Sequence, residues 1–184
     1  MQANGRQLLL DQRAVERTLA RMAREIVELN GGTDRLALLG IHRRGVHLAR
    51  YLAAEIERAE ARPIPVGSLD ITLYRDDLMA IGPRPVVGET RLPPGGVDGK
   101  AIVIVDDVVY TGRTVRAALD ELTDFGRPAR IYLCALVDRG GRELPIQPDI
   151  VGRHVDVLPG QAIEVLVPEL DGRLAVEIVS ATEA

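Results

Sequence analysis

An apolar run that ends in two adjacent acidic residues limits most strongly what this chain can fold into. Residues 101–105 are AIVIV, and Asp106 and Asp107 follow them directly. A strand that is apolar at every position is typical of the interior of a parallel sheet, where helices cover both faces. A short loop with small and hydroxylated residues comes next, and helical periodicity begins at Thr114. The segment therefore predicts a strand, a tight loop and a helix within an α/β domain.

The rest of the chain repeats this alternation of apolar runs and amphipathic helices. Apolar residues recur every three or four positions over residues 11–30, 45–59 and 114–125, which predicts three helices, the first with Asp11 at its N-cap. Further extended segments are expected at residues 35–41, 64–74, 130–137, 150–155, 163–167 and 174–179. We expect a mostly parallel sheet, whose ligands bind beyond the carboxyl ends of the strands.

Composition narrows the class of protein. A length of 184 residues suits one domain, and 46% apolar with 27% charged residues is typical of globular chains. The single cysteine, Cys134, excludes an internal disulfide framework, and three scattered histidines argue against a dedicated metal site. We find neither an apolar run near the roughly 20 residues of a membrane span nor a signal-peptide core. We therefore expect a cytoplasmic protein without a membrane partner.

The end of the apolar strand predicts an anion-binding site. Backbone N–H groups of residues 111–114, together with the positive end of the helix dipole, would face a phosphate. The hydroxyls of Thr111 and Thr114 add donors, and Gly112 lets the backbone approach the ligand closely. Asp106 and Asp107 suit ribose hydroxyls or a hydrated Mg²⁺. The alternative is an acidic turn followed by a threonine-capped helix.

This strand, acidic pair and TGRT loop resemble the phosphoribosyl pyrophosphate (PRPP) motif of type I phosphoribosyltransferases. The resemblance implies the type I phosphoribosyltransferase fold: one domain over residues 1–184, with a mostly parallel central sheet flanked by helices and a small hood. Residues 76–98, which proline and glycine interrupt repeatedly, would form its flexible lid loop. The resemblance also implies that residues 111–114, Arg113 included, bind the 5′-phosphate. Asp106 and Asp107 would bind the ribose and the Mg²⁺ that accompanies PRPP.

Two further segments match the same family. GIHRRG at residues 40–45 stands where the family has its pyrophosphate loop, so Arg43, Arg44 and Gly45 would hold the leaving pyrophosphate. By the same resemblance we expect a non-proline cis peptide between Arg43 and Arg44. DITLYRDD at residues 70–77 would open the catalytic loop, from which Arg75 reaches the pyrophosphate. The alternative is that the first segment is a solvated basic turn and the second an exposed charged hairpin, neither with a role in function.

The base is expected at the end of the next strand, beside Val137 and Asp138. There, and in DITLYRDD and VDDVVYTGRTVRAALD, the chain resembles the bacterial regulators of pyrimidine operons that are also uracil phosphoribosyltransferases. Tyr110 stands where 6-oxopurine enzymes commonly place an aspartate, which favours uracil. The resemblance implies the reaction uracil + PRPP → UMP + diphosphate. It also implies UMP or UTP as corepressor, a hairpin in the pyrimidine-operon leader mRNA as partner, and a homodimer or higher homo-oligomer.

A basic stripe on the first helix is the candidate for that RNA. Spacings of four, four and three place these arginines on one face, opposite the apolar stripe: Arg13, Arg17, Arg21 and Arg24. Such a stripe gives phosphate affinity without sequence choice. Arg142 and Arg153 would extend it, whereas Gly141 departs from the histidine common in the family. A solvated helix face, and hence an enzyme that has lost RNA binding, remains the alternative.

Overall fold

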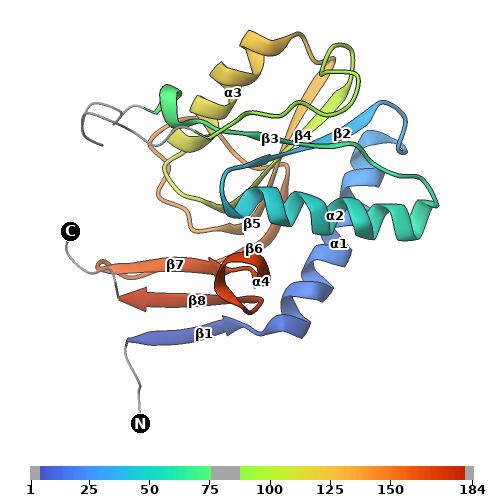
Figure 1. Ribbon diagram of the computed structural model, residues 1–184. Coiled ribbons are helices and arrows are strands. Elements are labelled where there is room, and N and C mark those ends of the chain that lie inside the picture. Colours follow the sequence, from blue (N-terminus) through green and yellow to red (C-terminus); the bar gives the residue numbers. More distant parts are fainter. Residues whose placement is uncertain (1–4, 76–87, 181–184) are drawn as a thin grey trace.

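Five parallel strands form the central sheet of the computed structural model, which describes residues 5–75 and 88–180 (Figure 1). Their order across the sheet is β3-β2-β4-β5-β6. The strands are β2 (Leu36–Ile41), β3 (Val66–Leu69), β4 (Ala101–Val109), β5 (Arg130–Asp138) and β6 (Ile150–His154). The predicted α/β fold with a parallel sheet is confirmed, and β4 runs four residues further than its apolar core predicts, through both aspartates.

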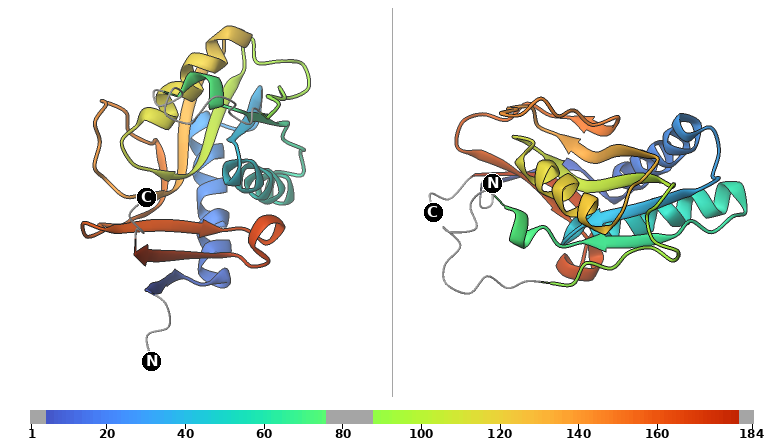
Figure 2. Two further views of the ribbon diagram at one scale, coloured as in Figure 1. Left: turned by 60° about the vertical axis from the view of Figure 1, so that its left-hand side comes forward. Right: turned by 90° about the horizontal axis from the view of Figure 1, so that it is seen from above.

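Helices cover both faces of this sheet. On one face lie α1 (Gln12–Asn30) and α2 (Arg44–Glu60), and on the other lies α3 (Arg113–Phe125), as Figure 2 shows. Alternation along β2 divides the core, since Leu36 and Leu38 pack toward α1 and α2 whereas Leu39 packs toward α3. Because both faces are covered, the strands are apolar throughout, as the sequence predicts.

Helix α1 illustrates how local sequence sets an element. The Asp11 carboxylate accepts a hydrogen bond from the Ala14 N–H at 2.8 Å, so the predicted N-cap is confirmed. Gly31 ends the helix in the left-handed conformation, at φ 71°. In the described part of the chain, no helix combines the length and apolar character needed to cross a membrane.

A second, antiparallel sheet forms the hood below α2 in Figure 1. Its strand order is β1-β8-β7, from β1 (Arg6–Leu10), β8 (Ala175–Ser180) and β7 (Gln161–Leu166). The short helix α4 (Pro168–Asp171) links β7 to β8. The sequence predicts neither β1 nor α4. Strand β1 has no local signal because it forms by pairing with β8, which lies at the far end of the chain; Arg6, for example, pairs with Val179.

The edge of the parallel sheet leads toward the predicted lid. Strand β3 is followed by a 3₁₀ turn, η1 (Thr72–Tyr74). The chain then returns beside β3, where Ser68 and Arg91 form an antiparallel bridge and Val97 is buried under α3. The other residues of the lid prediction, 76–87, lie outside the described part of the chain.

Candidate active site

A cavity of about 610 Å³ opens at the carboxyl edge of the parallel sheet. Three neighbouring strands end at it, as expected for an α/β sheet. Its polar lining is contributed by the segments that follow β2 and β3, by the end of β4 and by the start of α3: His42, Arg43, Asp70, Thr72, Arg75, Asp106, Asp107 and Thr114. The fold therefore brings together residues that lie up to 72 positions apart in the chain.

The two aspartates of β4 sit on the floor of this cavity in different environments. Asp106 is only 5% exposed, and burial, followed by the like charge of Asp107, raises its pKa. Backbone N–H groups hold both carboxylates: that of Asp107 donates to Asp106 Oδ1, and that of Val108 donates to Asp107 Oδ1, each at 2.9 Å. The pair is thus fixed in place, and a hydroxyl donor or a cation that faces it would relieve the repulsion.

The predicted phosphate loop forms the start of α3. Gly112 adopts a left-handed conformation at φ 92°, and the helix begins at Arg113, one residue earlier than the periodicity predicts. The Arg113 N–H donates to Thr111 Oγ1 at 3.3 Å, while the Arg113 side chain donates to Glu143 at 2.7 Å. Of the predicted phosphate loop, Thr114 lines the cavity, whereas Thr111, Gly112 and Arg113 are not among its lining residues.

The turn between β2 and α2 forms the opposite wall. A cis peptide joins His42 to Arg43, so the expectation of a cis bond between Arg43 and Arg44 is wrong by one position. The physical reason is that α2 already begins at Arg44, which leaves only His42 and Arg43 between strand and helix. Gly45 lies so close to β4 that a Cβ atom there would stand 2.5 Å from the Val105 carbonyl oxygen.

The side chains of the two arginines of this turn contact different parts of the molecule. Arg43 lines the cavity, whereas the Arg44 side chain reaches Asp171 of the hood, with Nη2 2.9 Å from Oδ1. The Asp171 carboxylate also accepts a hydrogen bond from the Val167 N–H at 2.8 Å. We therefore correct the prediction for Arg44: its guanidinium connects α2 to the hood, because the hood strands bring a carboxylate next to it.

At the end of β5, the predicted base-binding residue Asp138 is 7% exposed and already engaged. Its Oδ1 accepts from the Gly140 N–H at 3.0 Å, and its Oδ2 lies 2.8 Å from Arg142 Nη2. Arg142 also donates to the carbonyls of Tyr110 and Ile146, and its side chain is 12% exposed. Internal partners occupy the Arg142 guanidinium in this structure, and its contact with RNA stays a prediction.

Tyr110 is half-exposed beside this strand end. The Arg139 guanidinium lies over its ring, 4.0 Å from the centroid, which is the geometry of a cation–π contact. A Cβ atom at residue 141 would stand 2.4 Å from the Tyr110 ring. Gly141 also has a positive φ of 74°, a backbone conformation that favours glycine.

Comparisons with known proteins bear on the family and the fold of this chain. Residues 6–164 match the family described as the phosphoribosyl transferase domain. The chain is 56% identical over 170 residues to the Bifunctional protein PyrR of Thermus aquaticus, which covers 92% of this chain and 93% of that protein. It is 51% identical over 175 residues to the Bifunctional protein PyrR of Pelotomaculum thermopropionicum, covering 95% and 96%.

The chain belongs to the PyrR family of phosphoribosyltransferases. Its fold is also that of a hypoxanthine phosphoribosyl transferase from Trypanosoma cruzi, with a TM-score of 0.72, 17% identity and coverage of 98% of this chain and 93% of that one. The predicted type I phosphoribosyltransferase fold and the predicted family are confirmed.

In this PyrR-family protein, the arginines of α1 divide into two groups. Arg13, Arg17 and Arg24 are exposed. Arg21 instead donates to the Gly152 carbonyl of β6 and to Glu25, each at 2.5 Å. The helical periodicity places all four arginines on one face, but the guanidinium of Arg21 binds a carbonyl of the neighbouring strand β6.

Three further residues of the PyrR-family cavity had no predicted role: His42, Asp70 and Thr72. Each follows a parallel strand, since His42 comes after β2, and Asp70 and Thr72 come after β3. The rule that ligands bind beyond the carboxyl ends of such strands is the signal that would have found them. All three lie within the segments 40–45 and 70–77 that the sequence singles out, although no role is predicted for these individual residues.

Proposed function

We propose that this protein transfers a phosphoribosyl group from PRPP to uracil, which yields UMP and diphosphate, and that it also binds pyrimidine-operon leader mRNA as a UMP-responsive regulator. One observation supports the enzyme above all others. The acidic pair, the N-terminus of α3 and the Arg43 turn face a single cavity of about 610 Å³, which is the size of a small-molecule site.

Each wall of the cavity suits one part of PRPP. The N–H groups of residues 111–114, with the Thr114 hydroxyl, bind the 5′-phosphate at the positive end of α3. Asp106 and Asp107 bind the ribose hydroxyls, and Arg43 and Arg75 face the pyrophosphate. The transfer needs no nucleophile from the protein, so its residues act by aligning the reactants and balancing the charge of the leaving group.

Magnesium fits the acidic pair. Two carboxylates are the oxygen ligands that a hard divalent cation prefers. Burial and then the like charge of Asp107 raise the pKa of Asp106, and a bound cation would offset that repulsion. When bound with PRPP, Mg²⁺ supplies charge neutralisation for the departing pyrophosphate. Asp106 and Asp107 are the residues that we assign to it, through PRPP.

Uracil is the base that we assign to the end of β5. The side chains of Asp138 and Arg142 form an ion pair with each other, so neither is available to the base. Backbone groups around Val137 and Asp138, next to Tyr110, would therefore hold the base. Tyr110 offers no carboxylate to a purine N7, and a pyrimidine needs none. Measuring product formation from PRPP and Mg²⁺ with uracil, hypoxanthine and guanine tests this assignment, and turnover of either purine at the uracil rate would contradict it.

RNA binding is assigned to the outer face of α1. Arg13, Arg17 and Arg24 are exposed there, and Arg17 lines a groove of about 550 Å³ between α1 and α2. Arginine binds phosphate through a planar fork of donors. In a homodimer, two such faces would form a longer basic surface, which suits an RNA hairpin despite the net charge of −4.

Titration with leader RNA tests the regulator. We expect tight binding to the pyrimidine-operon leader hairpin that UMP strengthens and that added salt weakens. A scrambled hairpin of the same composition is the control. Equal, weak binding to both RNAs would leave uracil phosphoribosyltransferase activity alone.

A further inference from the structure

A relay of hydrogen bonds joins α3 to the turn that follows β3. The Thr90 hydroxyl accepts a hydrogen bond from the Asp70 N–H at 2.9 Å and donates its own proton to Glu121 Oε1. A hydroxyl carries one proton, so the Glu121 carboxylate decides where that proton points. We call Asp70, Thr90 and Glu121 the α3 relay.

Glu121 is an unusual residue for its place in the helix. It is 3% exposed and follows Val115 and Ala118 on the apolar face of α3, next to Leu122. Within the described chain its Oε2 has no hydrogen-bond partner. A buried carboxylate with unmet hydrogen-bonding capacity is costly, and an apolar side chain would pack there at lower cost. The burial of Glu121 therefore calls for a role other than stability, and the hydrogen bond that its carboxylate accepts from the Thr90 hydroxyl points to Thr90.

The other end of the relay lies in the PRPP cavity. Asp70 lines that cavity, and its Oδ1 accepts hydrogen bonds from the Thr72 N–H at 2.9 Å and the Thr72 hydroxyl at 2.5 Å. Its Oδ2 accepts from the Gly88 N–H. Asp70 thus holds the start of η1, three residues before Arg75.

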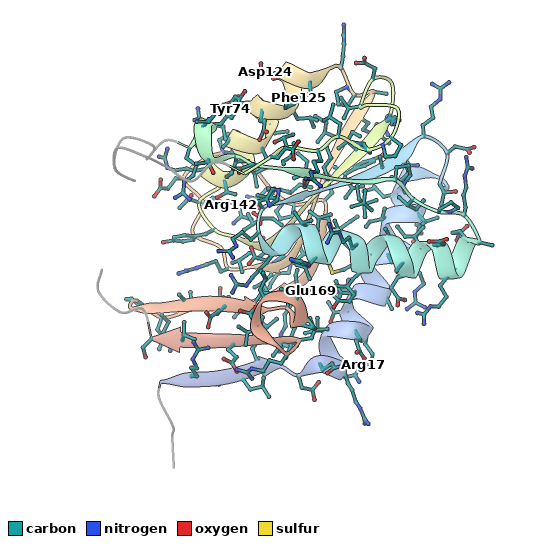
Figure 3. All side chains as sticks on the ribbon, in the orientation of Figure 1. Arg17, Tyr74, Asp124, Phe125, Arg142 and Glu169 are labelled. Carbon is teal, nitrogen blue, oxygen red and sulfur yellow. The ribbon has the colours of Figure 1, made fainter. Side chains whose placement is uncertain are left out.

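A second contact ties the same turn to the same helix. The Tyr74 hydroxyl donates to Asp124 Oδ2 at 2.5 Å, and Figure 3 shows these two side chains meeting at the outer end of α3. Glu121 and Asp124 are three positions apart, so α3 presents both carboxylates to one side. The helix that begins at the phosphate loop therefore also anchors the turn that precedes Arg75.

We propose that Glu121, acting through Thr90, is a positioning residue that sets the Asp70–Thr72 turn and so places Arg75 for the pyrophosphate of PRPP. The inference rests on the proposed transferase function. One rigid element, α3, then fixes the distance between the 5′-phosphate site at its start and the pyrophosphate side of the cavity. Uracil binds at the end of β5, outside the relay.

Replacing Glu121 by methionine separates positioning from stability. Glu121→Met keeps the volume and removes the acceptor, so the free energy of unfolding should stay level or rise. We expect KM for PRPP to increase about tenfold, as for the loss of a hydrogen bond to a charged group, with KM for uracil within about twofold of wild type. Glu121→Gln retains an acceptor and should restore most of the affinity.

Threonine variants provide an independent measurement on the same relay. Thr90→Val should raise KM for PRPP to the same extent as Glu121→Met, and Thr90→Ser should restore it. The double variant Glu121→Met with Thr90→Val should be no worse than either single variant, since both break one relay. The exposed residue Thr123, whose hydroxyl donates to the Asp120 carbonyl, is the matched control, and Thr123→Val should change neither constant.

The outcomes separate this inference from the function on which it rests. A wild-type protein that forms no UMP from uracil and PRPP contradicts the proposed function. An active wild type with unchanged KM for PRPP in Glu121→Met and Thr90→Val contradicts the relay alone. Equal loss of PRPP and uracil affinity, or a parallel fall in stability, would mean that Glu121 is structural. Should Glu121→Met fail to fold, Thr90→Val against Thr90→Ser decides the question.

Discussion

The cavity at the carboxyl edge of the parallel sheet and the outer face of α1 place charged side chains in opposite environments, one buried and one exposed. In the cavity, Asp106 is almost fully buried, and burial together with Asp107 raises its pKa. On α1, Arg13 and Arg17 extend into solvent. A buried charge has few partners and a fixed geometry, whereas an exposed charge is screened by salt and moves freely.

This difference predicts how each region responds to change. Altering the buried pair changes the chemistry of the site with little compensation from water. Altering an exposed arginine changes a long-range attraction by a small and salt-dependent amount. The predictions below test this contrast, and they run from the largest expected effect to the smallest.

Replacing Asp107 should have the largest effect. Asp107→Asn keeps an oxygen for the Val108 N–H but removes the charge that we propose for binding ribose and Mg²⁺. We expect about a 100-fold loss of kcat/KM for PRPP, comparable to the loss of one preorganised electrostatic group, with an unchanged unfolding midpoint. Asp120→Asn, on the exposed side of α3, is the control. A well-folded Asp107→Asn protein with full activity would refute the assignment.

A methyl group at Gly45 should break the contact beneath the cavity. The added Cβ would stand 2.5 Å from the Val105 carbonyl oxygen, where backbone rather than a flexible side chain must yield. We expect Gly45→Ala to lower the free energy of unfolding by about 2 kcal/mol, measured by urea denaturation. Arg50→Ala, on the exposed face of α2, should stay within about 0.5 kcal/mol of wild type.

The arginines of α1 should separate into RNA contacts and structural contacts. Arg17→Ala with Arg24→Ala should weaken leader-RNA binding about tenfold and lower the salt slope by about 2, with unchanged stability. Arg21→Ala should reduce stability, because the carbonyl of Gly152 loses its donor. If Arg17 and Arg21 variants lost the same RNA affinity and kept wild-type stability, the division into RNA contacts and structural contacts would be wrong.

The smallest effect concerns the link between α2 and the hood. Burial raises the pKa of Asp171, but hydrogen bonds from the Val167 N–H and Arg44 together outweigh it, so the pKa is lowered. Asp171→Asn should cost about 1 kcal/mol of unfolding free energy at pH 7. A lowered pKa contributes stability above the ordinary aspartate pKa, and that contribution is lost as the pH falls through the folded-state pKa.

Denaturation at a series of pH values checks this sign. The difference between wild type and Asp171→Asn should be full at pH 7 and shrink below about pH 4. Asp34→Asn, whose side chain is 88% exposed, should show a smaller difference throughout. A gap that widens on acidification would contradict the lowered pKa.

Local patterns were sufficient for most of the framework. The N-cap at Asp11, the apolar strand before Asp106 and the loop at Gly112 each depend on neighbours within a few residues, and each was predicted close to its position. The hood strand β1 was not, because its only signal is a pairing with β8 about 170 residues away. The sequence does not predict the α3 relay for the same reason, since Thr90 and Glu121 come into contact only in the folded chain.

By itself, the sequence determined the α/β class, the strand–loop–helix unit around Asp106 and the PyrR-family resemblance, because these depend on residues that are adjacent or helically spaced. Only the tertiary structure decided which polar groups remain free for ligands. Arg21 binds a carbonyl 131 positions away, and Arg44 binds a carboxylate 127 positions away. A guanidinium is satisfied by whichever acceptor the fold brings within reach, and that acceptor has no local signature in the sequence.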